Sequence, residues 1–242
     1  MQAIRTENLH KEYKDVTAVK SLNLAVEEGE LFSLLGVNGA GKTTTIKMLS
    51  CLTKPTSGDA FLMGKSIVRD AAEVKSVIGV SPQETAVATK LTARENLELI
   101  AGIYGSTRKE AKEKAAAMLE EFHMQEVAGQ RAGTLSGGWQ RRLSIAMALI
   151  SQPQILFLDE PTLGLDVLAR RELWNIIEKL KGRVTVILTT HYMEEAASLA
   201  DRVAILAHGR LRLCGTVQEI LDAAGETDFE NAFIKLAGGT EA

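Results

Sequence analysis

Residues 36–43 carry the clearest chemical signal in the chain, since they read Gly-Val-Asn-Gly-Ala-Gly-Lys-Thr. They match the pattern G-x-x-x-x-G-K-[ST], which forms a phosphate-binding loop when a strand precedes it and a helix follows it. The apolar residues 31–35 predict a buried strand, and residues 44–52 have helical spacing. The alternative is a glycine-rich turn with a chance lysine, and the flanking strand and helix disfavour it.

Each residue type in this loop has a use in phosphate chemistry. Glycine allows backbone angles that are closed to other residues and lets the chain approach a phosphate closely. The N–H groups of the loop and of the helix N-terminus offer partial positive charge. Lys42 adds a full charge for the outer phosphates, and the hydroxyl of Thr43 suits Mg²⁺. The residues expected to bind the phosphates are Gly36, Asn38, Gly39, Ala40, Gly41, Lys42, Thr43 and Thr44.

Two carboxylates follow a second apolar run. Residues 155–158 read Ile-Leu-Phe-Leu and predict a strand that is buried on both faces. Asp159 and Glu160 stand at its carboxyl end, where open α/β sheets place their ligands. Asp159 is suited to hold Mg²⁺, and Glu160 is suited to polarise the water that attacks a γ-phosphate. The alternative, a strand ending in a solvated acidic turn, is disfavoured by the phosphate loop elsewhere in the chain.

A second candidate anion site lies at residues 135–138, which read Leu-Ser-Gly-Gly before a helix that we expect to continue to residue 150. Ser136 is a good N-cap, and Gly137 and Gly138 leave backbone N–H groups open to an anion. The alternative is a plain capped helix after a flexible turn. One nucleotide does not need two such helix ends from one chain. Two chains facing head to tail would each supply one, and a two-fold axis closes that arrangement.

The elements that must position these residues alternate along the chain. Expected strands cover residues 3–9, 18–26, 31–35, 60–63, 77–80, 154–158, 184–190 and 202–206, with a turn at 208–210 into a short hairpin. Expected helices cover residues 44–52, 92–104, 107–122, 139–150, 167–180, 194–200, 217–223 and 229–236. Alternation at this spacing implies a parallel sheet with helices on its faces.

This pattern predicts one α/β domain with a mainly parallel sheet and an N-terminal antiparallel β subdomain. Residues 92–150 are mainly helical, which is typical of a subdomain inserted between strands. The expected parts are the core at 1–91 and 151–215, the helical subdomain at 92–150, and a short helical tail at 216–242.

Composition narrows the classes of protein that the chain could belong to. Its 242 residues are 45% hydrophobic and 24% charged, which is ordinary for a globular protein. The net charge of −3 and the absence of a long basic run argue against a nucleic-acid partner. Cys51 and Cys214 make no metal spacing, so reduced thiols and a cytoplasmic location are expected. No stretch is long enough to span a membrane, so action on a membrane would need a partner.

The motifs together resemble the nucleotide-binding subunit of ABC transporters over nearly the whole chain. In that family an adenine-stacking aromatic residue precedes the phosphate loop, which is followed by a glutamine, the LSGGQ signature, an Asp-Glu strand end, a loop ending in Asp, and a histidine. The resemblance implies a P-loop NTPase core that binds ATP and Mg²⁺. It assigns adenine stacking to Tyr13, sensing of Mg²⁺ and of the attacking water to Gln83, a loop at the dimer interface to residues 163–166, and a γ-phosphate contact to His191.

The same resemblance implies a function. Two ATP molecules would lie between two copies of the chain, and their hydrolysis would drive a separate integral membrane permease that docks near residues 83–104. This would place the protein on the inner face of the cell membrane. Residues 56–58 and 189–196 look most like those of exporters with separate permease subunits.

One alternative function remains open, and another is disfavoured. Some ATPases of this family serve soluble machines, such as iron–sulfur cluster assembly, and have the same motifs. A P-loop GTPase or small-molecule kinase fits poorly, because the chain has no Asn-Lys-x-Asp guanine motif and neither class uses an LSGG sequence.

One position departs from the family pattern, because Trp139 stands where the signature has its final glutamine. Ser136 and Gly138 are intact, so phosphate binding across a dimer should survive. Gln140 follows directly, but its side chain would point about 100° further round the helix, so we do not expect it to substitute.

Overall fold

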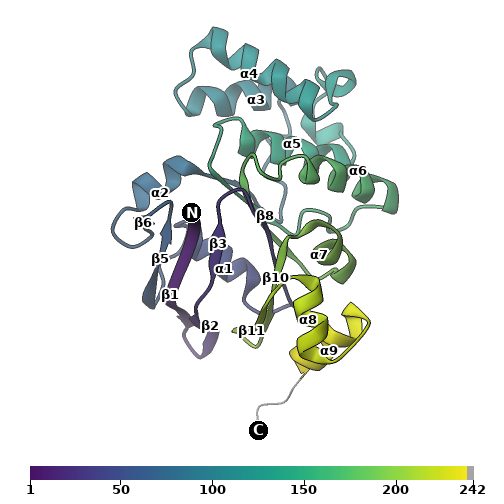
Figure 1. Cartoon of the computed structure of the whole chain (residues 1–242). Coiled ribbons are helices and arrows are strands. Elements are labelled where there is room, and N and C mark those ends of the chain that lie inside the picture. The colour runs from purple at the N-terminus through teal and green to yellow at the C-terminus, as the bar shows by residue number, and fades with distance from the viewer. Residues whose placement is uncertain (239–242) are drawn as a thin grey trace.

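Five parallel strands and one antiparallel edge strand form the larger of two sheets in the computed structural model, which describes residues 1–238 (Figure 1). Their order is β10 (Arg202–Ala207), β4 (Leu31–Leu35), β9 (Thr185–Thr190), β8 (Ile155–Asp159) and β7 (Ile78–Ser81), and β11 (Arg210–Gly215) pairs antiparallel with β10. Every residue of β4, β8 and β9 is buried, as is usual for parallel strands with both faces covered.

The smaller sheet is antiparallel and is built around β1 (Gln2–Tyr13). This strand pairs with β2 (Val16–Leu22), β3 (Ala25–Glu27) and β5 (Ser57–Leu62), and β5 also pairs with β6 (Lys65–Ser66). One apolar core joins the two sheets, since Ile4 of β1, Phe32 of β4 and Ile187 of β9 belong to the same cluster. The expected mixed α/β fold with an antiparallel N-terminal sheet is therefore confirmed.

The single strand expected at residues 18–26 is wrong in one respect, because two strands cover this region. The chain leaves the ladder between β2 and β3, where side chains take over the backbone hydrogen bonds. The amide of Leu24 donates to Oγ1 of Thr6 at 2.9 Å, and Oδ1 of Asn23 accepts from the amide of Asn8 at 2.8 Å. The apolar alternation continues through this break, so the sequence pattern does not show it.

Helices flank the larger sheet and extend from it. They are α1 (Lys42–Leu49), α2 (Ala71–Val77), α6 (Val167–Glu178), α7 (Met193–Leu199), α8 (Val217–Ala224) and α9 (Phe229–Gly238). Helix α2 is not among the expected helices, since it has only seven residues and buries only Val74. Its brief amphipathic pattern is too short to detect. No helix within residues 1–238 combines the length and apolar character that crossing a membrane requires.

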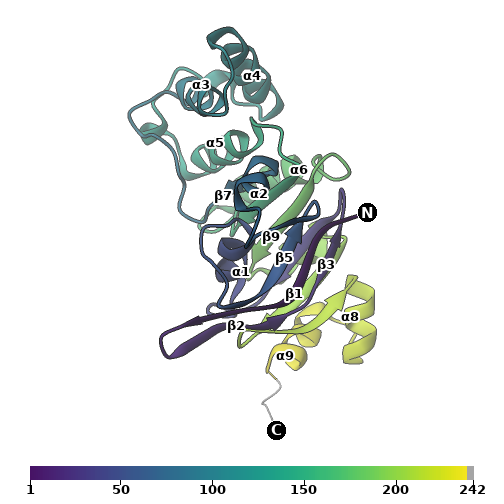
Figure 2. The ribbon, with the colours of Figure 1, turned by 90° about the vertical axis from the view of Figure 1, so that its left-hand side faces the viewer.

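The remaining long helices, α3 (Ala93–Ile103), α4 (Arg108–Glu121) and α5 (Gly137–Leu149), gather at one end of the molecule, far from the small antiparallel sheet (Figures 1 and 2). Short 3-10 turns at Gln125–Val127 and Ala132–Thr134 connect α4 to α5. Capping boxes start α3 at Thr92 and α4 at Thr107. We call α3, α4 and α5 with their connections the helical lobe.

The parallel strands bring four distant segments to one edge of the larger sheet. Residues 36–41 follow β4, Gln83 comes after β7, Asp159 and Glu160 end β8, and His191 follows β9. Because the carboxyl ends of parallel strands meet at the same edge, residues that are more than a hundred positions apart can form one site.

Candidate active site

The loop between β4 and α1 depends on glycine at two positions. Gly41 has a φ of 103°, and a Cβ there would lie 2.5 Å from the carbonyl oxygen of Ala18. A Cβ on Gly36 would lie 2.5 Å from the carbonyl oxygen of Leu206. Any other residue at either position would force the backbone to move, so the loop closes tightly against its neighbours only with glycine.

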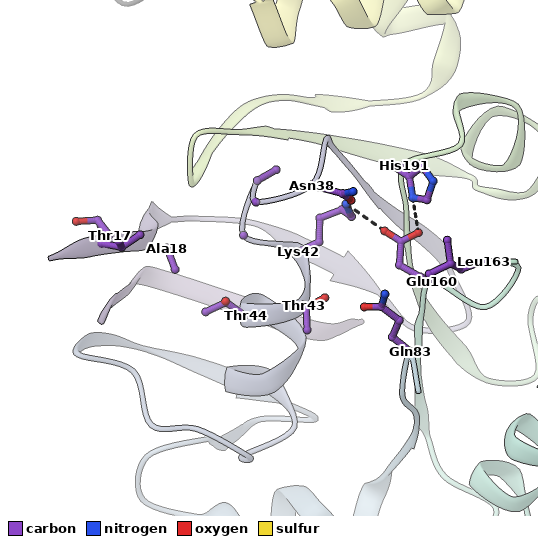
Figure 3. A pocket seen from close by; sticks show the side chains of 14 residues that line it. Thr17, Ala18, Asn38, Lys42, Thr43, Thr44, Gln83, Glu160, Leu163 and His191 are labelled. Atoms are coloured by element: carbon purple, nitrogen blue, oxygen red, sulfur yellow. Dashed lines mark hydrogen bonds and ion pairs between the residues drawn. The ribbon is translucent and has the colours of Figure 1, made fainter. Parts of the chain in front are cut away.

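A cavity of about 540 Å³ opens over this loop (Figure 3). Its lining combines the phosphate loop, the β2 strand and the ends of the parallel strands. The lining residues are Val16, Thr17, Ala18, Asn38, Gly39, Ala40, Gly41, Lys42, Thr43, Thr44, Gln83, Glu160, Leu163 and His191. The cavity therefore collects most of the residues that the sequence singled out.

Lys42, Glu160 and His191 form a continuous polar chain across the cavity (Figure 3). Nζ of Lys42 lies 3.1 Å from Oε1 of Glu160, and Nδ1 of His191 lies 2.8 Å from Oε2. Because a carboxylate only accepts, Nδ1 carries the proton of this contact and Nε2 is left for another partner. Lys42 and Glu160 are each only 5% exposed, and Nζ also donates to the carbonyl of Gly36 at 2.7 Å. The ammonium of Lys42 and the imidazole of His191 therefore fix the orientation of the Glu160 carboxylate, one on each oxygen.

The backbone of Glu160 is held in an uncommon conformation, with a φ of 49°. Its amide donates to both the carbonyl and the hydroxyl of Thr189, at 3.1 and 3.0 Å. A positive φ outside glycine costs free energy and persists only where the surroundings enforce it. Here the two bonds that the Glu160 amide donates to Thr189 of β9 hold it, and the carboxylate points into the cavity (Figure 3).

Oxygen atoms that suit Mg²⁺ lie close together beside the phosphate loop, although Asp159 is buried and is not among the residues that line the cavity. Oγ1 of Thr43 lies 3.1 Å from Oδ1 of Asp159, which also accepts from Oγ1 of Thr189 at 2.6 Å. The side chain of Gln83 reaches the same cavity from the end of β7 (Figure 3). Within residues 1–238 no three His, Cys, Asp or Glu side chains cluster as a metal cage. A hydroxyl and one carboxylate nevertheless fit Mg²⁺, which takes its remaining ligands from phosphates and water.

The second candidate anion site is not part of this cavity. Ser136 caps α5 as the sequence predicted, with its hydroxyl accepting from the amide of Trp139 at 3.4 Å. Ser136, Gly137 and Gly138 belong to the helical lobe and are not among the residues that line the cavity. At Gly138 the helix packs against α6, since a Cβ there would lie 3.3 Å from Cβ of Ala169.

Tyr13 also lies outside the lining of the cavity. It ends β1, is 44% exposed, and has Nζ of Lys11 4.8 Å from the centre of its ring. The lining is supplied instead by Val16, Thr17 and Ala18 of the adjoining strand β2. The assignment of adenine stacking to Tyr13 stays a prediction.

Trp139 and Gln140 have separate roles on α5. The guanidinium carbon of Arg142 lies 4.6 Å from the centre of the Trp139 ring, and Arg142 also pairs with Glu172 of α6. Nε2 of Gln140 donates to the carbonyl of Leu135 at 3.1 Å, so this side chain folds back on its own helix start.

The sequence predictions do not include several residues that shape the site. Residues 16–18 line the cavity, and the hydroxyl of Thr189 donates to the carboxylate of Asp159 and accepts from the backbone amide of Glu160. Leu163, which the family resemblance places in a loop at the dimer interface, also lines the cavity. Thr189 stands one residue from the end of its strand, where a polar residue in an apolar run is a usable signal. Val16 and Ala18 carry no chemical signal, because only the fold brings β2 against the phosphate loop.

Comparisons with known proteins agree with this geometry. A family model described as "ABC transporter" matches residues 19–163. The linearmycin resistance ATP-binding protein LnrL of Bacillus subtilis is 40% identical over 223 residues, which are 92% of this chain and 72% of that protein. Human ATP-binding cassette sub-family A member 2 is 43% identical over 229 residues, but this chain spans only 9% of that protein's length.

The fold has a close counterpart among solved structures. A dimeric ATP-binding cassette in a post-hydrolysis state, bound to ADP and Pi, superposes with a TM-score of 0.80 and 29% identity over 88% of this chain and 98% of that one. The matched family model covers more than half of the chain, and the sequence relative is similar over most of its own length. The chain therefore belongs to the ABC transporter family, as one of its ATP-binding ATPase domains.

Proposed function

We propose that this chain hydrolyses ATP to power an integral membrane permease, and that the transporter works as an exporter. The observation that carries the proposal is the contact of Glu160 with Lys42 and His191 beside the phosphate loop. A buried carboxylate with both oxygens directed, next to a phosphate cradle, is the arrangement that activation of an attacking water requires.

The residues of the site divide the chemistry between them. The backbone of residues 38–44 and the ammonium of Lys42 would bind the phosphates, and Lys42 would exchange part of its contact with Glu160 for a β/γ-phosphate oxygen. Glu160 would accept the proton of the attacking water. Because Nδ1–H of His191 is used on Glu160, Nε2 would donate to the γ-phosphate only from the doubly protonated imidazolium ring. Donors fixed before the reaction need not reorganise as charge develops, which lowers the barrier.

The Mg²⁺ of this proposal would be held by Thr43, Asp159 and Gln83. When bound, it neutralises charge on the β- and γ-phosphate oxygens. Asp159 is prepared for this role by its hydrogen bonds from Thr43 and Thr189, which fix its carboxylate beside the loop.

The site needs a second copy of the chain. The Ser136 helix end has the chemistry of an anion site but does not line the cavity of its own chain. A head-to-tail pair would place Ser136, Gly137 and Gly138 of each copy over the nucleotide of the other, and the similar cassette structure is dimeric.

We infer a permease partner and export from the family and from one relative. LnrL carries the name of a resistance protein, and export of a toxic compound is one route to resistance. The permease would dock beside Gln83 on residues 83–104 and would hold this chain at the inner face of the membrane. The transported compound is read by the permease rather than by this chain.

Phosphate release by the purified chain tests the enzymatic proposal. With ATP and Mg²⁺ the parent should release phosphate, and Glu160→Gln should lose this activity while it still binds ATP. Crosslinks from Cys introduced at Ile103 should reach a membrane protein in cells that contain the whole transporter. Crosslinks that reach only a soluble assembly would show that the ATPase powers a different machine.

A further inference from the structure

Arg141 connects the helix that begins at Ser136 with the loop that carries Gln83. Its Nη1 donates to the carbonyl of Pro82 at 2.7 Å, and its Nη2 donates to the carbonyl of Gln83 at 2.6 Å. These carbonyls belong to the peptide groups on either side of the Gln83 Cα. One planar guanidinium therefore fixes both peptide planes from which the Gln83 side chain projects.

A second contact from the same helix holds the preceding residue. The hydroxyls of Ser144 and Ser81 lie 2.9 Å apart and are buried. Ser144 lies one turn after Arg141 on α5, so the helix binds three consecutive residues, Ser81, Pro82 and Gln83. This stretch runs from the end of β7 to the loop, and it is therefore attached to the helical lobe as well as to the sheet.

The contacts of Arg141 are made at a considerable desolvation cost. Arg141 is 5% exposed and has two carbonyls as its partners, rather than a carboxylate at close range. Burial lowers the pKa of its guanidinium, and the charge of Asp159 opposes this effect. A buried cation is stable only where its donors are satisfied, so the two short bonds to the loop are its main compensation.

We infer that Arg141 is a positioning residue, which couples the orientation of the Ser136 helix to the placement of Gln83 in the active site. The inference rests on the proposed function, because it assigns Arg141 an effect on ATP turnover. This role differs from a purely structural one, because the effect of Arg141 on ATP turnover depends on the side chain of Gln83. When α5 shifts relative to the sheet, both carbonyls shift with it, and the side chain of Gln83 changes its position in the cavity.

A double-mutant cycle tests this coupling. Arg141→Met keeps an unbranched side chain but removes both donors. It should lower kcat for ATP at least about tenfold and change KM for ATP less than about threefold, because Lys42 and the loop are untouched. In a Gln83→Ala background the same change should lower kcat less than about twofold, because its target is already absent. Arg141→Lys should have a higher kcat than Arg141→Met, since an ammonium can donate to one of the two carbonyls but cannot hold both in a fixed geometry as a guanidinium does.

Ser144→Ala is the matched control, because it removes a buried hydrogen bond from the same helix without freeing Gln83. Its effect on kcat should be equal in the parent and in the Gln83→Ala background. If Arg141→Met lowers kcat by the same factor in both backgrounds, Arg141 does not act through Gln83 and the inference is wrong.

Amide hydrogen exchange provides a readout that does not depend on activity. Peptides that cover residues 82–91 should exchange faster in Arg141→Met than in the parent, and peptides from β4 and β9 should not change. Unchanged exchange at residues 82–91 would also overturn the inference. A parent chain without phosphate release would instead refute the proposed function, while the exchange result would still decide whether Arg141 holds the loop.

Discussion

At the scale of single residues, the site is organised around the two oxygens of Glu160. Lys42 contacts one oxygen and His191 contacts the other, so neither is free to rotate away. Removing one partner of a buried ion pair leaves the other charge uncompensated, which is usually costly. The three side chains are therefore expected to be sensitive to substitution, but in different ways.

Lys42→Ala should abolish measurable ATP binding and turnover, because it removes the charge that compensates the β- and γ-phosphates. We expect nucleotide affinity to fall by at least about a hundredfold, or roughly 2.7 kcal/mol. Titration with a fluorescent ATP analogue measures this, with Leu52→Ala as an exposed control away from the cavity. ATP affinity within a few-fold of the parent would show that Lys42 does not hold the phosphates.

Glu195 gives the site region a pH-dependent contribution to stability. This carboxyl is fully buried on α7 and accepts from Nε1 of Trp174 at 2.9 Å. Burial raises its pKa above the ordinary value of 4.5, and so does the charge of Glu160. The hydroxyls of Thr190 and Thr162 and the Trp174 ring lower it in part. The folded chain therefore keeps a proton that the unfolded chain loses.

Because only the folded chain keeps this proton, the stability that Glu195 contributes decreases as the pH rises. Stability from Glu195 is fully present below pH 4.5 and is lost as pH rises through the raised folded pKa. Glu195→Gln has no such proton, so its free energy of unfolding should rise relative to the parent as the pH increases above 4.5. Urea unfolding at several pH values checks this. A difference between the two proteins that does not change with pH would contradict the raised pKa.

Trp139 is the residue at which the chain departs from its family's signature. Its ring stacks on Arg142, which pairs with Glu172 of α6, so it has a structural partner within its own chain. Trp139→Gln should therefore leave ATP affinity and turnover within a few-fold of the parent. A loss of kcat/KM above about a hundredfold, roughly 2.7 kcal/mol of barrier, would place the indole in the catalytic site.

At the scale of elements, most residues of the site lie in short loops, and the strands and helices that flank these loops position them. The phosphate loop and the Asp159-Glu160 pair could be predicted from sequence, because each lies within a few residues of a strand with a strong apolar pattern. The contact of Arg141 with Gln83 joins positions 58 residues apart and uses backbone carbonyls, which have no sequence signature. The break between β2 and β3 was not predicted because the apolar alternation continues through it. The short helix α2 was not predicted because seven residues are too few to show a helical hydrophobic pattern.

The helices of the lobe expose apolar residues at the proposed permease surface. Ile103 and Tyr104 are 69% and 52% exposed at the end of α3, and a groove beside them is lined by Pro82, Ala86 and Ile100. Val87 is less suited to a test, because it packs against the core of the helical lobe.

Ile103→Glu should therefore uncouple transport and leave the ATPase rate of the isolated chain within about twofold of the parent, because single exposed changes rarely disturb folding. Leu52→Glu, a similar change at another exposed apolar position, is the control and should leave both properties unchanged. Transport by cells that carry the whole system measures the effect. Unimpaired transport in Ile103→Glu would remove this end of α3 from the docking surface.

At the scale of the whole molecule, the fold separates the cavity from the Ser136 helix end, which the proposed function uses as a second anion site. The cavity lies at the edge of the larger sheet, and the Ser136 helix end belongs to the helical lobe. We expect Glu160→Gln to form a dimer in ATP and Mg²⁺, and the further change Ser136→Arg to prevent it by placing a bulky side chain at the helix end. Size-exclusion chromatography with light scattering measures both, and a dimer that survives Ser136→Arg would argue against this interface.

Glu160 is proposed to perform the proton chemistry on ATP held by the phosphate loop, and the identity of the nucleotide retained by Glu160→Gln is the sharpest test of that role. The variant is incubated with ATP and Mg²⁺, free nucleotide is removed, and the bound nucleotide is extracted and quantified beside the parent. The variant should retain intact ATP, one molecule per chain, while the parent should yield ADP. Formation of ADP by Glu160→Gln at the rate of the parent would show that Glu160 is not the base.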